Sequence, residues 1–109
     1  MIVDKSLLSG SLSMLLLRLL SEKDMYGYEM IETLKKRSEN VFELKAGTLY
    51  PLLHSLEEKN YLTSYEQEVS GKTRKYYGIT KEGRKFLEKK CCEWENYKNA
   101  VANVLALEV

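Results

Sequence analysis

The sequence predicts a mainly α-helical fold with a small β-wing: a winged helix-turn-helix plus a long C-terminal dimerisation helix. Three observations support this prediction. Leu49, Leu52, Leu53 and Leu56 recur at helical spacing. Two runs rich in β-branched and aromatic residues flank a Ser-Gly-Lys turn at 70–72 and indicate a two-stranded ribbon. A heptad-like apolar pattern then follows toward the C-terminus.

Composition bounds the class of protein. The 109 residues are 44% hydrophobic and 30% charged, which is ordinary for a globular protein and too apolar for disorder. One proline and six glycines favour long, uninterrupted helices. Because the net charge is only +1, attraction to a nucleic acid would have to come from a local cluster of bases. We expect a winged-helix unit over residues 1–80, with its first helix contributing to a dimer, and a C-terminal helix over 81–109.

The first expected helix spans residues 5–20 and is apolar nearly all round. Such a helix must be covered on two sides, and in so small a chain we expect the second cover from another subunit. The segment is too short and too polar to span a bilayer, with Arg18 inside it and no small-residue cleavage site after it. We therefore expect a cytoplasmic protein without a membrane partner.

A second helix is expected at about 25–38, with Asp24 as its N-cap. Met30, Ile31 and Leu34 form its apolar stripe. The three bases at 35–37 lie in its last turn, where they either compensate the helix dipole or contact phosphate, the first reading being slightly favoured. Residues 41–44 suit a short connecting strand.

The third helix, about 47–59, has the most unusual surface. Pro51 is tolerated best in a first turn, so the helix should begin near Gly47 or Thr48, with Thr48 a plausible cap, or bend at Pro51. Its outer face is polar or aromatic and lacks an acid before Glu57. Such residues can reach base edges and phosphates. The alternative is a plain amphipathic core helix. The outer residues are Thr48, Tyr50, Pro51, His54 and Ser55.

The ribbon is expected at 61–69 and 73–79, with Leu62, Tyr77 and Ile79 facing the core. Residues 72–85 hold six bases and one acid, a local +5 that the global count hides. This clustering suits phosphate contact, although charged hairpin tips also keep sheet edges soluble.

Thr80 should cap a final helix that reaches about Leu107. Its apolar seam has no further chain to cover it, so we expect it to pair with a second subunit. The adjacent Cys91 and Cys92 read as free thiols, and the single histidine offers no metal cluster. The seam consists of Leu87, Cys91, Trp94, Lys98, Val101 and Leu105, broadened by Tyr97 and Val104.

Three blocks of the chain resemble the signature of the PadR-type transcriptional regulators. They are Tyr26-Gly-Tyr-Glu29, Gly47-Thr-Leu-Tyr-Pro-Leu-Leu-His-Ser-Leu-Glu57 and Arg74-Lys-Tyr-Tyr-Gly-Ile-Thr-Lys-Glu-Gly83. The short length resembles the compact branch that includes the multidrug-sensing repressor LmrR. The resemblance implies a homodimeric repressor of detoxification, efflux or stress genes that binds an inverted-repeat double-stranded DNA operator and needs no cofactor.

The same resemblance implies two sets of site residues. DNA contacts are expected from the third helix, the wing and the start of the second helix, namely Tyr26, Thr48, Tyr50, Pro51, His54, Lys72, Thr73, Arg74 and Lys75. A planar aromatic effector is expected to stack on Trp94, helped by Met14, Cys91 and Tyr97. Alternatively, Trp94 is only interface packing. The small Cys91 and the cationic Lys98 depart from the branch at this pocket.

Two other function classes compete with a DNA-binding regulator. An enzyme would need a nucleophile–base pair, a metal cluster or a phosphate loop, and the sequence contains none of these patterns. A winged-helix module that binds protein rather than DNA remains the principal alternative, because bulk charge does not distinguish the two.

Overall fold

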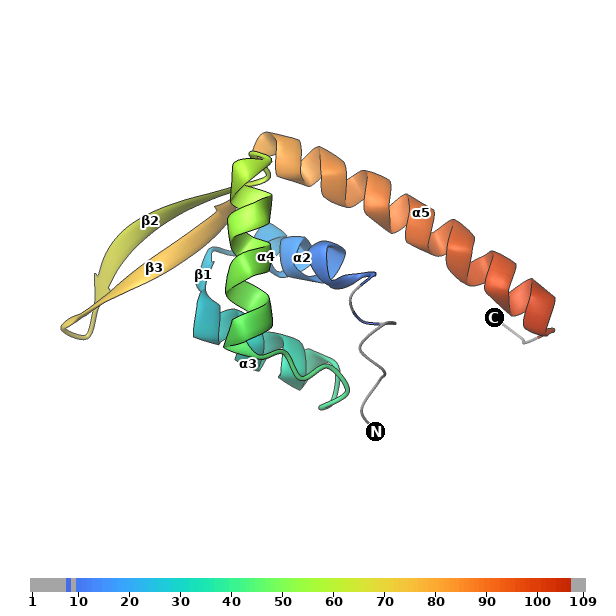
Figure 1. Ribbon diagram of the computed structural model, residues 1–109, viewed down its shortest axis with the longest axis horizontal. Helices are drawn as coiled ribbons and strands as arrows, with labels where there is room; N and C mark the ends of the chain where they lie inside the picture. Colours follow the sequence, from blue (N-terminus) through green and yellow to red (C-terminus); the bar gives the residue numbers. More distant parts are fainter. Residues whose placement is uncertain (1–7, 9, 107–109) are drawn as a thin grey trace.

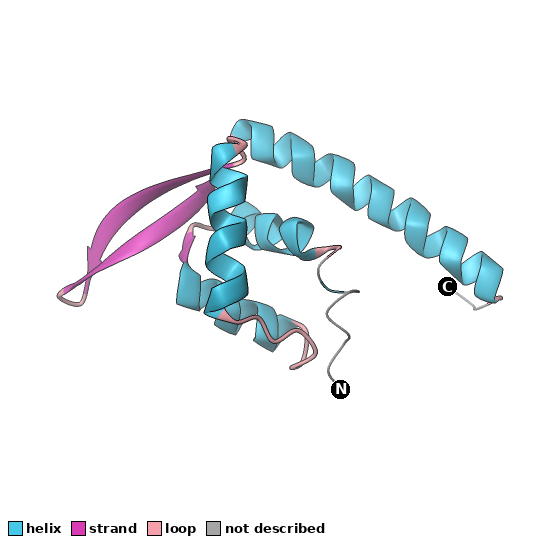
Figure 2. Cartoon of the chain, viewed as in Figure 1, coloured by secondary structure: helices cyan, strands magenta, loops and turns pink. Residues whose placement is uncertain are grey.

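The computed structural model describes residues 8 and 10–106, and within them it confirms the mainly helical class with a small sheet (Figure 1). The three strands are antiparallel and lie in the order β1-β3-β2. Figure 2 shows the two long strands projecting from the helices as a ribbon. In chain order the elements are α2 (Leu12–Glu22), β1 (Met25–Tyr26), α3 (Gly27–Arg37), α4 (Ala46–Glu58), β2 (Leu62–Val69), β3 (Lys72–Ile79) and α5 (Lys81–Leu105).

Helix α2 lies at the centre of the core, and its apolar surface on several sides is confirmed. Leu16 and Leu17 are fully buried on different sides of the helix, and Leu12, Leu19 and Leu20 are nearly so. The expected continuous helix at 5–20 is wrong in its first half, because Gly10 and Ser11 form a turn; α2 begins at Leu12 and ends at Glu22, two residues beyond the expected end. Residues 5–7 and 9 lie outside the described part of the chain.

Asp24 does not cap the second helix, so that prediction is wrong. Met25 and Tyr26 instead pair with Tyr77 and Tyr76 of β3 as a two-residue strand. Helix α3 therefore begins at Gly27, with Tyr26 at its N-cap and no side-chain cap bond. The Asp24 carboxylate instead accepts a hydrogen bond from the Tyr65 hydroxyl.

The expected strand at 41–44 is also wrong, because the third strand of the sheet is β1. The segment is a loop that the end of α3 holds in place: the Phe42 amide donates to Ser38 Oγ at 2.9 Å. Glu39 and Asn40 before it have positive φ, which turns the chain out of the helix. Leu44 is buried, so the apolar pattern of the segment reflects core packing rather than strand pairing.

The leucine stripe of α4 is confirmed, with Leu49, Leu53 and Leu56 buried and Leu52 partly buried. The start was misjudged by a residue or two. Helix α4 begins at Ala46 with Lys45 at the N-cap, so Thr48 is not the cap. Pro51 therefore lies in the second turn, where its missing N–H leaves the helix one hydrogen bond short.

The ribbon and the cap of the last helix are as expected. Strands β2 and β3 join through Ser70 and Gly71, both with positive φ, which matches a tight hairpin turn. Of the expected core residues, Leu62 and Tyr77 are buried and Ile79 is partly buried. Thr80 Oγ1 accepts a hydrogen bond from the Gly83 amide at 2.9 Å and so caps α5.

Helix α5 leaves the body and extends well beyond it (Figure 1). It ends at Leu105, and the expected end at Leu107 lies outside the described residues. The chain is elongated as a result, measuring 54 × 31 × 21 Å along its principal axes. None of the helices that the structure describes is both long and apolar enough to cross a bilayer.

Candidate nucleic-acid interface

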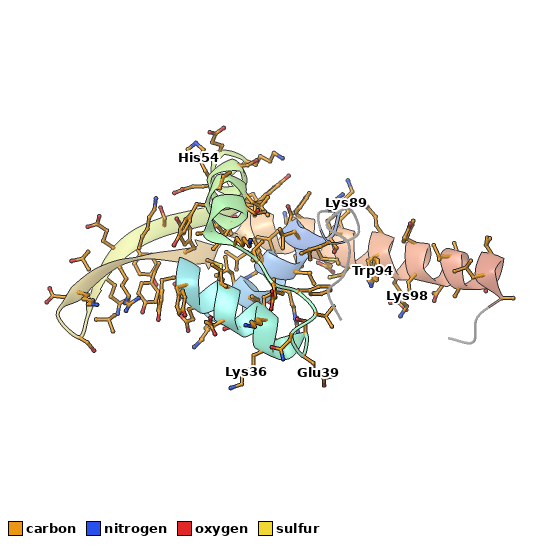
Figure 3. The ribbon with its side chains drawn as sticks, turned by 60° about the horizontal axis from the view of Figure 1, so that its bottom comes forward. Lys36, Glu39, His54, Lys89, Trp94 and Lys98 are labelled. Carbon is orange, nitrogen blue, oxygen red and sulfur yellow. The ribbon has the colours of Figure 1, made fainter. Side chains whose placement is uncertain are left out.

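The outer face of α4 is open to solvent. Thr48, Tyr50, Pro51 and His54 are all exposed, on the side of the helix opposite its buried leucines. Figure 3 shows His54 projecting from α4 well away from Lys36 at the end of α3. His54 Nε2 lies 2.7 Å from a carboxylate oxygen of Glu58, so this face carries an acid next to its only histidine.

Tyr50 is positioned by a glycine that the sequence did not single out. Its ring lies against Gly27 so closely that a Cβ on Gly27 would collide with the phenol. Tyr50 nevertheless remains 46% exposed. The close approach of α4 to the first residue of α3 therefore fixes the direction of an aromatic side chain on the exposed face.

The bases of the ribbon do not form a single patch. Successive residues of a strand point to opposite faces, so Lys72 and Arg74 lie on one face of β3, and Thr73 and Lys75 lie on the other. Arg74 stacks on Tyr26, with its guanidinium carbon 4.3 Å from the ring centroid. The sequence could not separate these faces without knowing the strand register.

Lys75 lies on the face of the ribbon that contacts α4. The Lys75 ammonium lies 5.5 Å from the Tyr77 ring centroid. Burial raises the pKa of Tyr77, and Tyr50 and Glu57 raise that pKa further while Lys75 opposes them. Ser64 of β2 also donates a 2.6 Å hydrogen bond to Glu57 of α4. The face of the ribbon that carries Ser64, Lys75 and Tyr77 is thus joined to α4.

Acids on β2 offset part of the positive charge of the ribbon. Glu66 pairs with Lys75 and Glu68 pairs with Thr73 across the two strands. Glu66 and Glu68 therefore add two acids to the face of the ribbon that carries Lys75. Glu66 and Glu68 lie before the stretch in which the bases cluster, so a count along the sequence missed them.

The bases at the end of α3 mostly serve the fold. Arg37 Nη1 donates to both carboxylate oxygens of Glu22 at 3.0 Å, and Lys35 lies 3.9 Å from Glu43. Lys36 is exposed, and no acid lies within salt-bridge distance of it in the described residues. These ion pairs give Lys35 and Arg37 partners within the fold, which disfavours phosphate contact for these two bases.

The four candidate effector residues are divided between two elements. Trp94 and Tyr97 on α5 are 45% and 63% exposed, with ring centroids 6.1 Å apart. Cys91 is exposed and is a free thiol. Met14 lies on α2, partly buried against the main core. In the part of the chain that is described, no three His, Cys, Asp or Glu side chains are arranged to hold a metal ion.

The family model described as the transcriptional regulator PadR-like family matches residues 16–89. This chain belongs to the PadR family. PadR regulators are DNA-binding proteins rather than enzymes, and they typically act as dimers. The match begins within α2, covers the rest of the winged helix and the first turns of α5, and ends before Trp94. It therefore bears on the candidate DNA-binding surface but not on the second half of α5.

Similar proteins agree with this assignment. A PadR-family regulator from Eggerthella lenta has a solved structure with 34% identity and a TM-score of 0.82, covering 92% of this chain and 86% of that one. A transcriptional regulator from Clostridium thermocellum has 36% identity and a TM-score of 0.84, covering 90% and 96%. The regulator YqjI of Escherichia coli is 32% identical over 79 residues, 72% of this chain but only 37% of YqjI.

Proposed function

We propose that this PadR regulator is a repressor that binds an inverted-repeat DNA operator as a homodimer. Helix α4 lies in the major groove, where Thr48, Tyr50, Pro51 and His54 contact bases and phosphates. The observation that carries the proposal is the Ser64–Glu57 hydrogen bond, which joins α4 to the face of the ribbon that carries Lys75. Further backbone contacts come from Tyr26, Lys72, Thr73 and Arg74.

The chemistry of this surface favours binding through phosphates and DNA shape. The outer face of α4 carries no Arg, Asn or Gln, the residues that most often make paired hydrogen bonds to guanine or adenine. Affinity should therefore fall steeply with added salt, because releasing counterions from the DNA is less favourable at a higher salt concentration. Two-fold pairing sets the half-sites about one helical turn apart, roughly 34 Å.

The homodimer is supported by the second half of α5. Trp94, Tyr97, Val101, Val104 and Leu105 are between 37% and 86% exposed. Contiguous apolar surface of this kind marks a protein–protein contact in a soluble chain. A second copy of the same helix offers a matching apolar seam.

The effector is a planar aromatic compound that stacks on Trp94, as the resemblance to the LmrR-like branch implies. The exposure of Trp94 and the nearby Tyr97 ring support this role. Trp94 is the only tryptophan, so its fluorescence reports the site directly. Emission should change on titration with planar dyes or antibiotics, and unchanged emission across such a panel contradicts the aromatic effector. The regulated genes are then of the detoxification, efflux or stress class.

DNA binding is tested by fluorescence anisotropy with a labelled duplex from the upstream region of the protein's own operon. Affinity should drop by about 10³-fold or more between 50 and 200 mM salt. Replacing Lys72, Arg74 and Lys75 together by Ala should weaken binding to all sequences about equally, whereas Tyr50→Ala should weaken the operator preferentially. Replacing Lys89 and Lys90 by Ala removes charge from α5 outside the 72–85 cluster and is the control. Absent binding, or binding without a salt slope, favours the protein-binding module instead.

A further inference from the structure

The outer face of the wing is tied to the body across a whole strand. The Tyr65 hydroxyl on β2 donates a hydrogen bond to Asp24 Oδ2 at 2.6 Å. Asp24 precedes β1, and β3 lies between β1 and β2. The bond therefore spans β3 and joins the strand of the wing farthest from β1 to the segment between α2 and α3.

Gly78 leaves room for this crossing. It is buried on β3, and a Cβ at this position would lie 2.8 Å from Asp24 Oδ1. A larger residue would push the carboxylate away from the strand that it crosses. The small side chain at 78 thus serves the placement of Asp24, a role that no local sequence pattern signals.

Aromatic rings complete the contact, one from each strand. Tyr26 meets Tyr76 edge-on with centroids 5.5 Å apart, and Tyr65 stacks on Tyr76 at 5.9 Å. Such aromatic pairs stabilise a fold by more than the burial of their apolar area alone. The Tyr65–Asp24 bond closes this row, and the hydrogen bond to Asp24 raises the pKa of the Tyr65 phenol above its ordinary value.

Two ion pairs tie the segment that carries Asp24 to α3. Lys23 Nζ lies 2.9 Å from Glu29 of α3, and Glu22 at the end of α2 accepts from Arg37. Asp24 is therefore a fixed point of the body. By contrast, Glu66, Gln67 and Glu68 beyond Tyr65 are exposed, so this part of β2 has no cover of its own.

We propose that Asp24 and Tyr65 are positioning residues that hold the wing at one angle to α4. This inference rests on the proposed DNA-binding function, since its consequence is the placement of Lys72, Arg74 and Lys75 against the phosphate backbone. From Tyr65 to Val69 the strand advances about 13 Å, so a small rotation at Tyr65 moves the tip by several ångströms. On the opposite face the Ser64–Glu57 bond opposes the same rotation. The wing is thus held from both faces, and loss of either tie frees it.

The test uses Tyr65→Phe, which removes one hydroxyl and keeps the ring, together with Asp24→Ala and the double variant. Tyr28→Phe, which removes an exposed phenol from α3, is the control. Each protein is measured for amide exchange of residues 66–75, for melting temperature and for the Kd of the same operator duplex. Both single variants should exchange wing amides several-fold faster and bind about fivefold to tenfold more weakly. The double variant should be no worse than either single one, because both remove the same bond. Asp24→Asn keeps an acceptor and should recover part of the affinity.

The outcomes separate the two proposals. Wild-type protein that binds no duplex defeats the proposed function and this inference with it. Wild-type protein that binds, with a Tyr65→Phe variant within twofold of it, overturns the positioning role alone. The positioning role is also overturned if the amide exchange of residues 66–75 is unchanged. It is overturned as well if the losses of operator affinity in the two single variants add in the double variant. A purely structural contact would lower the melting temperature without the selective gain in exchange at 66–75.

Discussion

The winged-helix body and the second half of α5 use the same kind of side chain in opposite ways. Leu16, Leu49 and Leu53 in the body are fully buried, whereas Val104 and Leu105 on α5 are 86% and 61% exposed. Both regions repeat apolar residues at helical spacing, but only the body finds its cover within the described chain. The body therefore stabilises itself, and the seam of α5 is suited to a surface on another molecule.

The largest effect on stability is expected in the body. Leu53→Ala removes a fully buried side chain from between α4 and the core, and it should lower the free energy of unfolding by about 2–5 kcal/mol. Urea denaturation followed by circular dichroism measures this loss. A loss below about 1 kcal/mol would mean that α4 is packed less tightly than the burial of its leucines indicates.

The seam should respond differently. Replacing Val101 and Leu105 together by Asp buries unpaired charges at the expected subunit contact, so the dimer should dissociate at least about a hundredfold more readily. The body should stay folded, because neither residue belongs to its core. Analytical ultracentrifugation and circular dichroism measure the two properties. Asn96→Asp with Asn103→Asp adds the same charge to the other side of α5, and equal weakening by this control would contradict the seam.

Gly83 tests the joint between the two regions. Alanine usually stabilises a helix relative to glycine by about 1 kcal/mol. At Gly83, however, a Cβ would collide with the backbone carbonyl of Tyr61, so Gly83→Ala should destabilise the protein by about 1–3 kcal/mol. Gly47→Ala on α4 meets no atom within 4 Å and is the matched control, expected to be neutral or stabilising. Thermal melting distinguishes the two signs.

Gly27→Ala should change stability only slightly and operator affinity more. The added methyl displaces the Tyr50 ring, whose outer end can swing into solvent, so the melting temperature should change by only a few degrees. Operator affinity should fall because Tyr50 no longer points along the exposed face of α4. Unchanged affinity, measured by anisotropy, would remove Tyr50 from the contact surface.

The smallest effect concerns pH. The hydrogen bond to Asp24 raises the pKa of Tyr65, so its stabilising contribution is complete below the ordinary tyrosine pKa and disappears as pH rises through the folded value. Asp24→Ala should lower the pKa of Tyr65. Nuclear magnetic resonance titration of the tyrosine rings detects this change, and an unshifted Tyr65 would mean that the bond is not formed in solution.

Local patterns in the sequence predicted the elements but not the contacts between distant segments. The leucine stripe of α4, the turn at Ser70-Gly71 and the Thr80 cap depend on residues within a few positions of one another, and all three were found. The start of α3 was missed because β1 exists only through pairing with β3, some fifty residues later. The same cause hid the division of the wing bases between two faces, because strand register decides it.

Sedimentation equilibrium of the unmodified protein at micromolar concentration tests most directly whether α5 joins two chains. We expect a dimer of about 25 kDa, twice the 12.7 kDa of one chain. A single 12.7 kDa species under those conditions would contradict it, because one copy cannot present two α4 helices to two half-sites.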